Sequence, residues 1–187
     1  ERVEADPEID LDFEYTVEGH PTDTDSLANL AGALEGELKF SKRERQHNTI
    51  KAIADYQFGD AAGDALFGDI EIQTTGRYPK LQIRNGDGDQ LATMVPQYGL
   101  LALTLAGGDR WLASDAPTKT VDIEGFVPHG SVLAPGVVDA SDEIRPGDEV
   151  VIQGSAAFAV GRAEMSGPEM VESTRGVAST VRHVRER

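Results

Sequence analysis

The sequence has no cysteine, few aromatic residues and no long apolar run. The lack of cysteine excludes disulfides, thiolate zinc sites and cysteine nucleophiles. No stretch approaches the roughly 18 consecutive apolar residues of a membrane-spanning helix, and the first residues, Glu1 to Glu4, do not resemble a signal peptide. We therefore expect a cytoplasmic protein with no membrane contact. Since Glu1 is not a methionine, we also expect a processed product or a piece of a longer chain.

Basic residues are scarce, and lysine is less frequent than arginine. The chain carries 33 acidic and 17 basic side chains, a formal charge of −16, and only five of the basic residues are lysines. An acidic chain normally argues against nucleic acid, because phosphate binding depends on Lys and Arg. Low lysine with dispersed carboxylates, however, resembles proteins of extreme halophiles, and about 1 M salt screens charges beyond roughly 3 Å. Net charge is therefore only a weak argument against an RNA partner. The alternative is an ordinary acidic protein of a mesophile.

The acidic residues are most concentrated at the start of the chain. Residues 1–37 contain 12 acidic side chains and one basic side chain. Residues 1–25 also hold few apolar side chains, so we expect an acidic flexible arm there. Apolar and acidic residues alternate from Ile9 to Tyr15, and a short edge strand is the alternative for that stretch.

Residues 26–116 combine a helical pattern with a strand pattern. The spacing of apolar residues predicts helices near 27–34, 41–58 and 61–67. The apolar period then changes to two and predicts strands within 70–73, 78–84, 91–95 and 100–105, with a strong turn at 85–88. Gly107 and Gly108 are expected to close the last strand. This order predicts a small α+β domain in which helices precede a four-stranded antiparallel sheet.

Residues 117–187 consist of short apolar runs separated by glycine and proline. Strands are expected near 121–123, 148–152, 157–163 and 177–184, with a short helical start at 166–170. Many short strands with such punctuation favour a small β-barrel. Residues 115–118 are the best candidate for a linker between two domains. We therefore expect the domains to span 26–116 and 117–187.

The sequence contains no pattern that demands catalysis. It has no Walker-type phosphate loop, no dinucleotide fingerprint and no Gly-x-Ser-x-Gly context around Ser131. The stretch 85–89 resembles the start of a calcium loop but lacks a glutamate at the twelfth position, which favours a hairpin turn. The four histidines lie far apart in the sequence. We therefore expect no catalytic residue, metal site or cofactor within this chain.

Two segments have the residue types of a phosphate contact. Lys39, Lys42, Arg43 and Arg45 form a basic cluster at a helix start, where the helix dipole does not favour cations. The loop 131–136 has small residues that let backbone amides approach a phosphate. A solvated helix face and ordinary turn residues are the alternatives, and composition does not decide between them.

Four spaced blocks in the last domain carry a family resemblance: 130–138 (GSVLAPGVV), 144–150 (IRPGDEV), 159–163 (AVGRA) and 175–178 (RGVA). In this order they resemble the PUA domain, a small β pseudo-barrel found at the C-terminus of many RNA-modifying enzymes. The block 48–59 (NTIKAIADYQFG) is similar to the domain that precedes PUA in archaeal tRNA-guanine transglycosylases and archaeosine synthases. The resemblance implies an α+β domain followed by a PUA-like pseudo-barrel.

The stretch 126–135 (FVPHGSVLAP) is more similar to the archaeosine synthase version of this region than to the transglycosylase version. The resemblance implies an archaeal enzyme that acts on 7-cyano-7-deazaguanine in the D-loop of tRNA and adds an amine donor to the nitrile to make archaeosine. Its catalytic region lies upstream of the part that this chain resembles. We therefore expect this chain to bind and orient tRNA and to perform no bond chemistry itself.

The resemblance also implies where RNA is held, namely at the loop 131–138 and along the last strand, 177–184. Leu133 and Pro135 would offer apolar contacts to a terminal base pair or an unpaired end, and arginines would supply forked phosphate contacts. Replacing Arg182 with alanine is expected to weaken tRNA binding with little effect on the melting temperature. The expected RNA-binding residues are Lys39, Lys42, Arg43, Arg45, His129, Ser131, Leu133, Pro135, Gly136, Arg162, Arg175, Arg182 and His183.

Two alternatives come from other functional classes. The chain could be a stand-alone RNA-binding module or an accessory subunit that recruits a separate enzyme, with the acidic arm as its docking element. It could also have a chiefly structural role and form a homo-oligomer through the face of its first sheet. The expected partners are thus tRNA together with an upstream catalytic region or a second copy of the chain.

Overall fold

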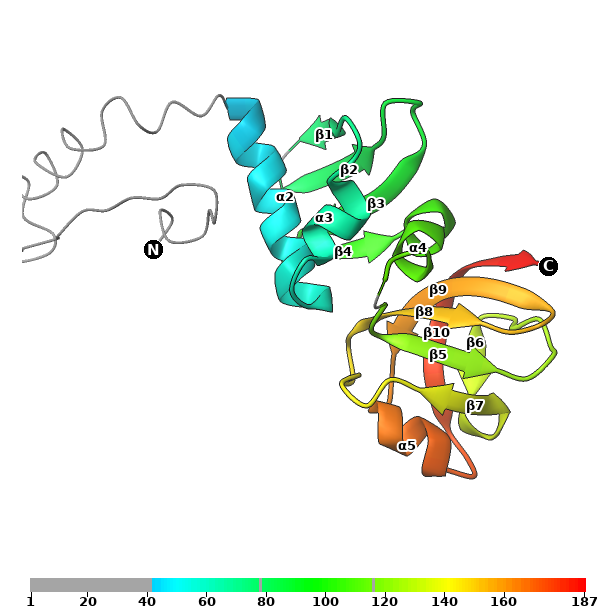
Figure 1. The fold of residues 1–187 in the computed structure, drawn as a ribbon. Helices are drawn as coiled ribbons and strands as arrows, with labels where there is room; N and C mark the ends of the chain where they lie inside the picture. The colour runs from blue at the N-terminus through cyan, green and yellow to red at the C-terminus, as the bar shows by residue number, and fades with distance from the viewer. Residues whose placement is uncertain (1–41, 78, 116) are drawn as a thin grey trace, which may run out of the picture. The chain divides into compact units, whose positions relative to one another are not determined.

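The computed structural model describes residues 42–77, 79–115 and 117–187. The arm expected at 1–25, the helix expected near 27–34 and Lys39 lie outside the described residues. Residues 49–187 form one compact unit that contains both sheets of the protein (Figure 1).

In the described part of the first domain, helices α2 and α3 precede a four-stranded sheet (Figure 1). The sheet has the order β1-β2-β3-β4 with antiparallel neighbours throughout. The expected α+β arrangement is confirmed, although the first strand begins at Gln73 and not at Ile70. The elements are α2 (Lys42–Phe58), α3 (Ala62–Phe67), β1 (Gln73–Arg77), β2 (Lys80–Arg84), β3 (Gln90–Val95) and β4 (Leu100–Leu103).

The apolar side chains of the helices and of the sheet pack together in one core. Ile50, Ala54 and Phe58 recur at helical spacing along α2 and are buried. Leu81 and Ile83 alternate with polar residues along β2 and are buried in the same cluster. The helices therefore cover one face of the sheet and leave the alternate positions of the strands on the other face.

A further helix, α4 (Leu105–Leu112), follows β4 where the sequence predicts the end of a strand. The Thr104 side chain caps it by accepting a hydrogen bond from the Gly107 N–H at 3.2 Å. Gly107 and Gly108 lie buried inside the helix instead of closing the strand. A Cβ on Gly107 would stand 2.1 Å from the Leu91 carbonyl oxygen, and one on Gly108 would stand 2.8 Å from a valine of the second domain. The expectation was wrong because these glycines serve close packing and not a turn.

Six strands form the second domain, and their sheet curls into a half-open barrel (Figure 1). The order is β6-β10-β9-β8-β5-β7, in which β5 and β8 are parallel and the other neighbours antiparallel. The expected pseudo-barrel is confirmed. The elements are β5 (Thr120–Ile123), β6 (Ser131–Leu133), the 3-10 turn η1 (Ala134–Gly136), β7 (Val137–Ala140), β8 (Glu149–Gln153), β9 (Ala157–Ala163), α5 (Gly167–Glu172) and β10 (Val177–Glu186).

The two domains share an apolar core at helix α4. Trp111 of α4 and Phe58 of α2 have ring centroids 5.3 Å apart, and Phe158 and Val160 of β9 belong to the same buried cluster. The Trp111 indole N–H donates to the Thr118 carbonyl oxygen at 2.7 Å, and the Thr118 hydroxyl donates to the Phe58 carbonyl oxygen at 2.5 Å. The chain between the domains is thereby bonded to the first domain.

An ion pair between the buried Glu149 and Arg182 hydrogen-bonds to the open edge of the first sheet. β4 is the last strand of its sheet, so the backbone groups on its open side need partners. The Leu103 N–H donates to Glu149 Oε1 at 2.8 Å, and the Arg182 guanidinium donates to the Leu103 carbonyl oxygen at 2.7 Å and to both carboxylate oxygens of Glu149. Arg185 adds two hydrogen bonds to Asp109 of α4, at 2.8 and 2.9 Å. We call the contact of Leu103 with Glu149 and Arg182 the Leu103 clamp.

The environment of Glu149 shifts its titration toward neutral pH. The residue is only 6% exposed, and this burial raises the pKa of Glu149 to about 7. The Arg182 guanidinium, the Leu103 N–H and, more weakly, the charge of Arg162 favour the ionised form and oppose the rise in pKa. The carboxyl therefore keeps its proton in the folded chain at pH values where an unfolded chain has released it.

Replacing Arg182 with alanine is expected to destabilise the folded chain. The substitution removes the counter-charge of the buried Glu149 carboxylate, which keeps the hydrogen bond from the Leu103 N–H, and it removes the side-chain donor to the Leu103 carbonyl oxygen, at a cost on the order of 3 kcal/mol. For a chain of this size the Tm, measured by thermal unfolding at about pH 8, should fall by roughly 5–10 °C. The expectation from sequence of little change in Tm assumed a free surface cation, and the Leu103 clamp contradicts that assumption.

The Lys51→Ala substitution is the matched control for this prediction. Lys51 pairs with Asp64 at 2.9 Å, but the Asp64 side chain is 75% exposed. Exposed ion pairs of this kind contribute less than about 1 kcal/mol. A change in Tm no larger for Arg182→Ala than for Lys51→Ala would show that the Leu103 clamp does not stabilise the fold.

The stability of the folded chain is expected to fall as the pH rises from about 5 to about 8. Between the ordinary glutamate pKa of 4.5 and about 7, the folded chain holds a proton on Glu149 that the unfolded chain has released. This contribution is fully present below the lower value and is lost as the pH rises through the upper one. Glu149→Gln cannot titrate and should flatten the slope in urea unfolding at several pH values. Equal slopes for the variant and the parent chain would contradict the raised pKa.

Candidate nucleic-acid interface

The loop between β5 and β6 is closed by backbone hydrogen bonds. The Glu124 N–H, at the start of the loop, donates to the carbonyl oxygen of Gly136 in η1 at 3.1 Å. The Val181 N–H donates to the Gly130 carbonyl oxygen at 2.9 Å and ties the loop to β10. Gly130 has a φ of +81°, a left-handed conformation that glycine adopts without steric cost. The loop is therefore held in one position against the barrel.

Side chains of β6 and η1 alternate between the barrel core and the surface. Val132 and Ala134 are buried in the core of the second domain. Leu133, between them, is 54% exposed, and Pro135 is also exposed. Along β6 the side chains alternate between the two sides of the strand, and η1 continues this alternation. Leu133 and Pro135, which were expected to bind RNA, therefore lie on the outer side.

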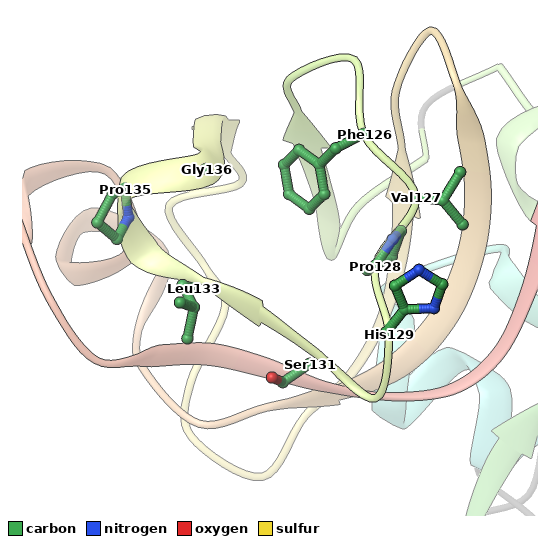
Figure 2. Close-up of a pocket in the computed structure, with 8 residues that line it drawn as sticks. All are labelled: Phe126, Val127, Pro128, His129, Ser131, Leu133, Pro135 and Gly136. Carbon is green, nitrogen blue, oxygen red and sulfur yellow. The ribbon is translucent and has the colours of Figure 1, made fainter.

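A pocket of about 490 Å³ lies within this loop (Figure 2). Its wall is apolar apart from His129 and Ser131, and no lining residue carries a carboxylate. In a chain with 33 acidic side chains, this surface does not repel an anion through its own residues. The lining residues are Phe126, Val127, Pro128, His129, Ser131, Leu133, Pro135 and Gly136.

The absence of a side chain at Gly136 makes room for the Phe126 ring. A Cβ on Gly136 would stand 2.9 Å from two carbons of that ring, closer than side chains tolerate. The Phe126 ring is half-buried and faces the interior of the loop (Figure 2). The ring and the backbone of η1 thus define one side of the pocket together.

Five of the residues expected from the sequence come together in this pocket, and the expected cations do not line it. Arg175 is exposed and lies next to Gly176, whose carbonyl oxygen accepts a hydrogen bond from the Ala134 N–H at 3.0 Å. The chain at Arg175 therefore runs beside η1. The five are His129, Ser131, Leu133, Pro135 and Gly136.

The other expected cations of the barrel lie on β9 and β10. The Arg162 guanidinium stands 5.1 Å from the centroid of the Tyr98 ring, which belongs to the turn between β3 and β4. Arg182 is engaged in the Leu103 clamp. His183 is exposed on β10. All three residues are exposed, but the Arg182 guanidinium is ion-paired with Glu149, whereas the Arg162 guanidinium donates to a backbone group, the Gly147 carbonyl oxygen, at 3.0 Å.

The expected basic cluster of the first domain lies at the start of α2. Arg43 and Arg45 are exposed in the first turns of this helix, which begins at Lys42. The side chain of Lys42 and the whole of Lys39 lie outside the described residues. The placement of Arg43 and Arg45 on a helix agrees with the expected helix from residue 41.

Phe126, Val127 and Pro128 line the pocket but were absent from the residues expected to bind RNA. The sequence did indicate them, because three consecutive apolar residues are unusual in a connection between two strands. Such residues cannot all reach the core from a loop, and Phe126 and Val127 remain half-buried.

Other kinds of site find little support in the described ranges. There, no group of three or more His, Asp or Glu side chains comes together in a way that could hold a metal ion. No helix of the described residues is long and apolar enough to cross a membrane. His129 is the one titratable side chain that lines the pocket.

Two family profiles match successive parts of the chain. Residues 48–117 match the patch-forming domain C2 of tRNA-guanine transglycosylase, and residues 123–185 match the PUA domain. The chain carries a C2 domain followed by a PUA domain. The C2 match spans the first sheet and α4, and the PUA match spans the curled sheet with the pocket. The resemblance inferred from the sequence blocks is confirmed.

Curated relatives carry the names of the two archaeosine enzymes. The chain is 64% identical over its whole length to an archaeosine synthase of Haloferax volcanii, and 44% identical over 95% of its length to an archaeosine synthase subunit alpha of Methanosarcina acetivorans. It is 37% identical over 75% of its length to a tRNA-guanine(15) transglycosylase of Pyrococcus furiosus. It spans only 32%, 29% and 25% of these proteins, respectively. The higher identities to the synthases agree with the preference drawn from residues 126–135.

Solved structures share the fold across both domains. One, a protein of unknown function, is 30% identical with a TM-score of 0.67, and the match covers 98% of this chain and 62% of that chain. Another, a hypothetical protein of Pyrococcus horikoshii, is 27% identical with a TM-score of 0.59, and the match covers 77% of this chain and 91% of that chain. The succession of C2 and PUA domains therefore has structural counterparts in other proteins.

Replacing Gly136 with alanine is expected to destabilise the PUA domain. The added methyl group would push the Phe126 ring or η1 outward, and overpacking of this kind costs about 1–3 kcal/mol. Gly86→Ala is the matched control, because its Cβ would meet a single atom at 3.9 Å, an ordinary contact. Thermal unfolding measures both variants. Equal Tm values would contradict the tight packing of Phe126 on this turn.

Proposed function

We propose that this chain is the tRNA-binding part of an archaeosine-forming enzyme. The observation that carries the proposal is the carboxylate-free pocket in the β5–β6 loop of the PUA domain. The 64% identity to an archaeosine synthase supports the choice of enzyme. In this proposal the chain holds the tRNA while other parts of the protein act on the D-loop nucleotide.

The pocket is suited to the end of an RNA strand. Phe126, Leu133 and Pro135 form an apolar wall against which a base or sugar of a terminal or unpaired nucleotide can pack. His129 and Ser131 supply hydrogen-bonding groups for a phosphate or a 2′-hydroxyl. Binding of this kind depends on shape and stacking more than on charge, so we expect it to persist in concentrated salt.

Basic residues would provide the phosphate contacts. Arg175 beside η1, Arg162 on β9 and His183 on β10 are the exposed PUA residues that we assign to this role. We assign the exposed Arg43 and Arg45 of α2 to it as well, together with the expected lysines Lys39 and Lys42. An arginine guanidinium can donate hydrogen bonds to two phosphate oxygens at once. We assign Arg182 a structural role in the Leu103 clamp and not a direct RNA contact. A substitution of Arg182 would then change RNA binding only by changing the position of the PUA domain.

The complete enzyme would combine this chain with an upstream catalytic region. That region would add an amine donor to the nitrile of 7-cyano-7-deazaguanine in the D-loop, and this chain would orient the tRNA toward it. We place an acidic arm at 1–25, the C2 domain within 26–116 and the PUA domain within 117–187. The relative from Haloferax volcanii and the acidic composition favour the cytoplasm of a halophilic archaeon.

An accessory subunit is the second candidate. Two relatives, from Methanosarcina acetivorans and Thermococcus kodakarensis, are named archaeosine synthase subunit alpha, which favours an enzyme with more than one subunit. In this case the chain would bind RNA and recruit a separate catalytic protein, or it would act as a homo-oligomer. The reading frame of the gene discriminates, because an in-frame catalytic region upstream supports the first candidate. Sedimentation in molar salt tests the homo-oligomer.

Replacing Leu133 with serine is expected to weaken tRNA binding without lowering the Tm. Leu133 is 54% exposed, so the fold loses little, whereas a base packed on it would lose an apolar contact. We expect the Kd for tRNA to rise roughly fivefold or more. Val171→Ser is the matched control, because Val171 is an exposed apolar residue on α5 that lies outside the segments 131–138 and 177–184 and does not line the pocket.

Fluorescence anisotropy with a labelled tRNA transcript, from about 0.5 to 3 M potassium chloride, measures these affinities, with duplex DNA as the control ligand. Equal affinities of the Leu133→Ser and Val171→Ser variants would exclude the pocket as the interface. No binding of tRNA by the parent chain at any salt concentration would overturn the proposed function and favour recruitment through protein contacts.

A further inference from the structure

The polar side chains of the pocket lie together at the turn that leads into β6. His129 and Ser131 flank Gly130, and the other six lining residues are apolar side chains or glycine. Figure 2 shows both side chains at this turn, across the pocket from Pro135 and Gly136. The Val181 N–H donates to the Gly130 carbonyl oxygen at 2.9 Å and fixes the turn against β10. The pocket therefore has one polar end at a fixed place in an otherwise apolar wall.

The charge of this polar end depends on His129. None of the eight lining residues is Arg, Lys, Asp or Glu. Of the arginines on the neighbouring strands, Arg182 pairs with Glu149, and Arg162 donates to the Gly147 carbonyl oxygen at 3.0 Å. Histidine is the side chain whose charge changes between pH 5 and 8. An anion at the polar end therefore meets a cation when the imidazole is protonated and a neutral hydrogen-bonding group when it is not.

The charged residues nearest to the loop along the chain do not enter the pocket. Glu124 begins the loop and Arg175 precedes β10, and both are exposed without lining the pocket. On β10, the residue directly opposite Ser131 is the uncharged Thr180, and the exposed His183 also lies outside the pocket. The protonation of His129 alone therefore changes the charge of the pocket lining between pH 5 and 8.

The rest of the pocket suits a single nucleoside with a free phosphate. Its volume of about 490 Å³ lies in the lower half of the range of small-ligand pockets, about 300–1,000 Å³. A nucleotide inside a chain has a phosphodiester on each side, and each phosphodiester carries one negative charge. A phosphomonoester carries about −1.5 to −2 at pH 7 and presents three acceptor oxygens. A protonated imidazole beside a hydroxyl group therefore favours the monoester over the diester.

We propose that the pocket binds the terminal phosphomonoester of an RNA strand, with the protonated His129 and the Ser131 hydroxyl as its hydrogen-bond donors. The identity of the RNA as tRNA rests on the function proposed above. The base or sugar of the same terminal nucleotide packs on the apolar wall at Phe126 and Leu133.

This assignment also gives the enzyme a place in a reaction sequence. A terminal phosphomonoester forms when water breaks one P–O bond of a phosphodiester, so that the phosphate stays on one end and the other fragment leaves with a hydroxyl. A precursor with extra nucleotides at that end presents only phosphodiesters to the pocket. The reaction that supplies the RNA is therefore a hydrolytic trimming of its end, which precedes binding here.

The test compares tRNA transcripts that differ only in the group at the 5′ end, phosphate or hydroxyl, with the full chain at one salt concentration. At about pH 6 the 5′-phosphate transcript should bind roughly tenfold more tightly in fluorescence anisotropy, because hydrogen bonds between charged groups are strong. At about pH 8 the imidazole is neutral, and the ratio should fall to about twofold or less. The ratio of the two Kd values is the readout, since the contacts that both transcripts share cancel in it.

Two substitutions at His129 separate its charge from its hydrogen bonds. His129→Gln keeps a hydrogen-bond donor without a charge and should abolish the preference at both pH values. His129→Arg stays charged and should keep the preference at both pH values. His183→Gln is the matched control, because His183 is an exposed histidine outside the pocket, and the ratio should retain its pH dependence. Since both histidines are exposed, the Tm should not change.

A third transcript, with a 3′-phosphate and a 5′-hydroxyl, identifies the strand end. A preference for either phosphorylated transcript that depends on His129 upholds the phosphomonoester and shows which end enters the pocket. Equal Kd values for all three transcripts at about pH 6, or a preference that persists in His129→Gln, would overturn this inference, while a weakened Leu133→Ser variant upholds the proposed function. If the parent chain binds none of the transcripts, the proposed function fails together with this inference.

Discussion

The backbone of Leu103, at the open edge of the first sheet, is the point on which the arrangement of the two domains depends. Its N–H and C=O groups cannot pair with a further strand, and Glu149 and Arg182 of the barrel take that place. The same contact buries the Glu149 carboxyl and lifts its pKa, and it brings Phe158 and the rest of β9 onto Trp111 of α4. The fixed position of the β5–β6 loop relative to the C2 domain follows from this contact and from the shared core beside it.

Local periodicity predicted most of the fold, because apolar spacing in α2 and alternation in β2 are properties of neighbouring residues. It failed at α4, where Gly107 and Gly108 have the composition of a turn. These glycines are required by the approach of the Leu91 backbone and of β9, which are distant in sequence. The prediction that Arg182 is a free surface cation was wrong for the same reason. Its partner Glu149 lies 33 residues earlier, and a charged residue on a strand does not reveal whether it faces water or a buried carboxylate.

The pocket residues from His129 to Gly136 were predictable because they are contiguous and because the family resemblance points to that loop. Phe126 was missed, since its role depends on packing against Gly136 across the loop closure.

The Leu103 clamp also has a consequence for how the chain unfolds. Leu103 lies on β4 of the C2 sheet, whereas Glu149 and Arg182 lie on β8 and β10 of the barrel, so the contact exists only when both sheets are formed. Loss of either sheet would leave backbone or carboxylate groups of the other without these partners. The C2 and PUA domains are therefore expected to unfold together in one cooperative transition.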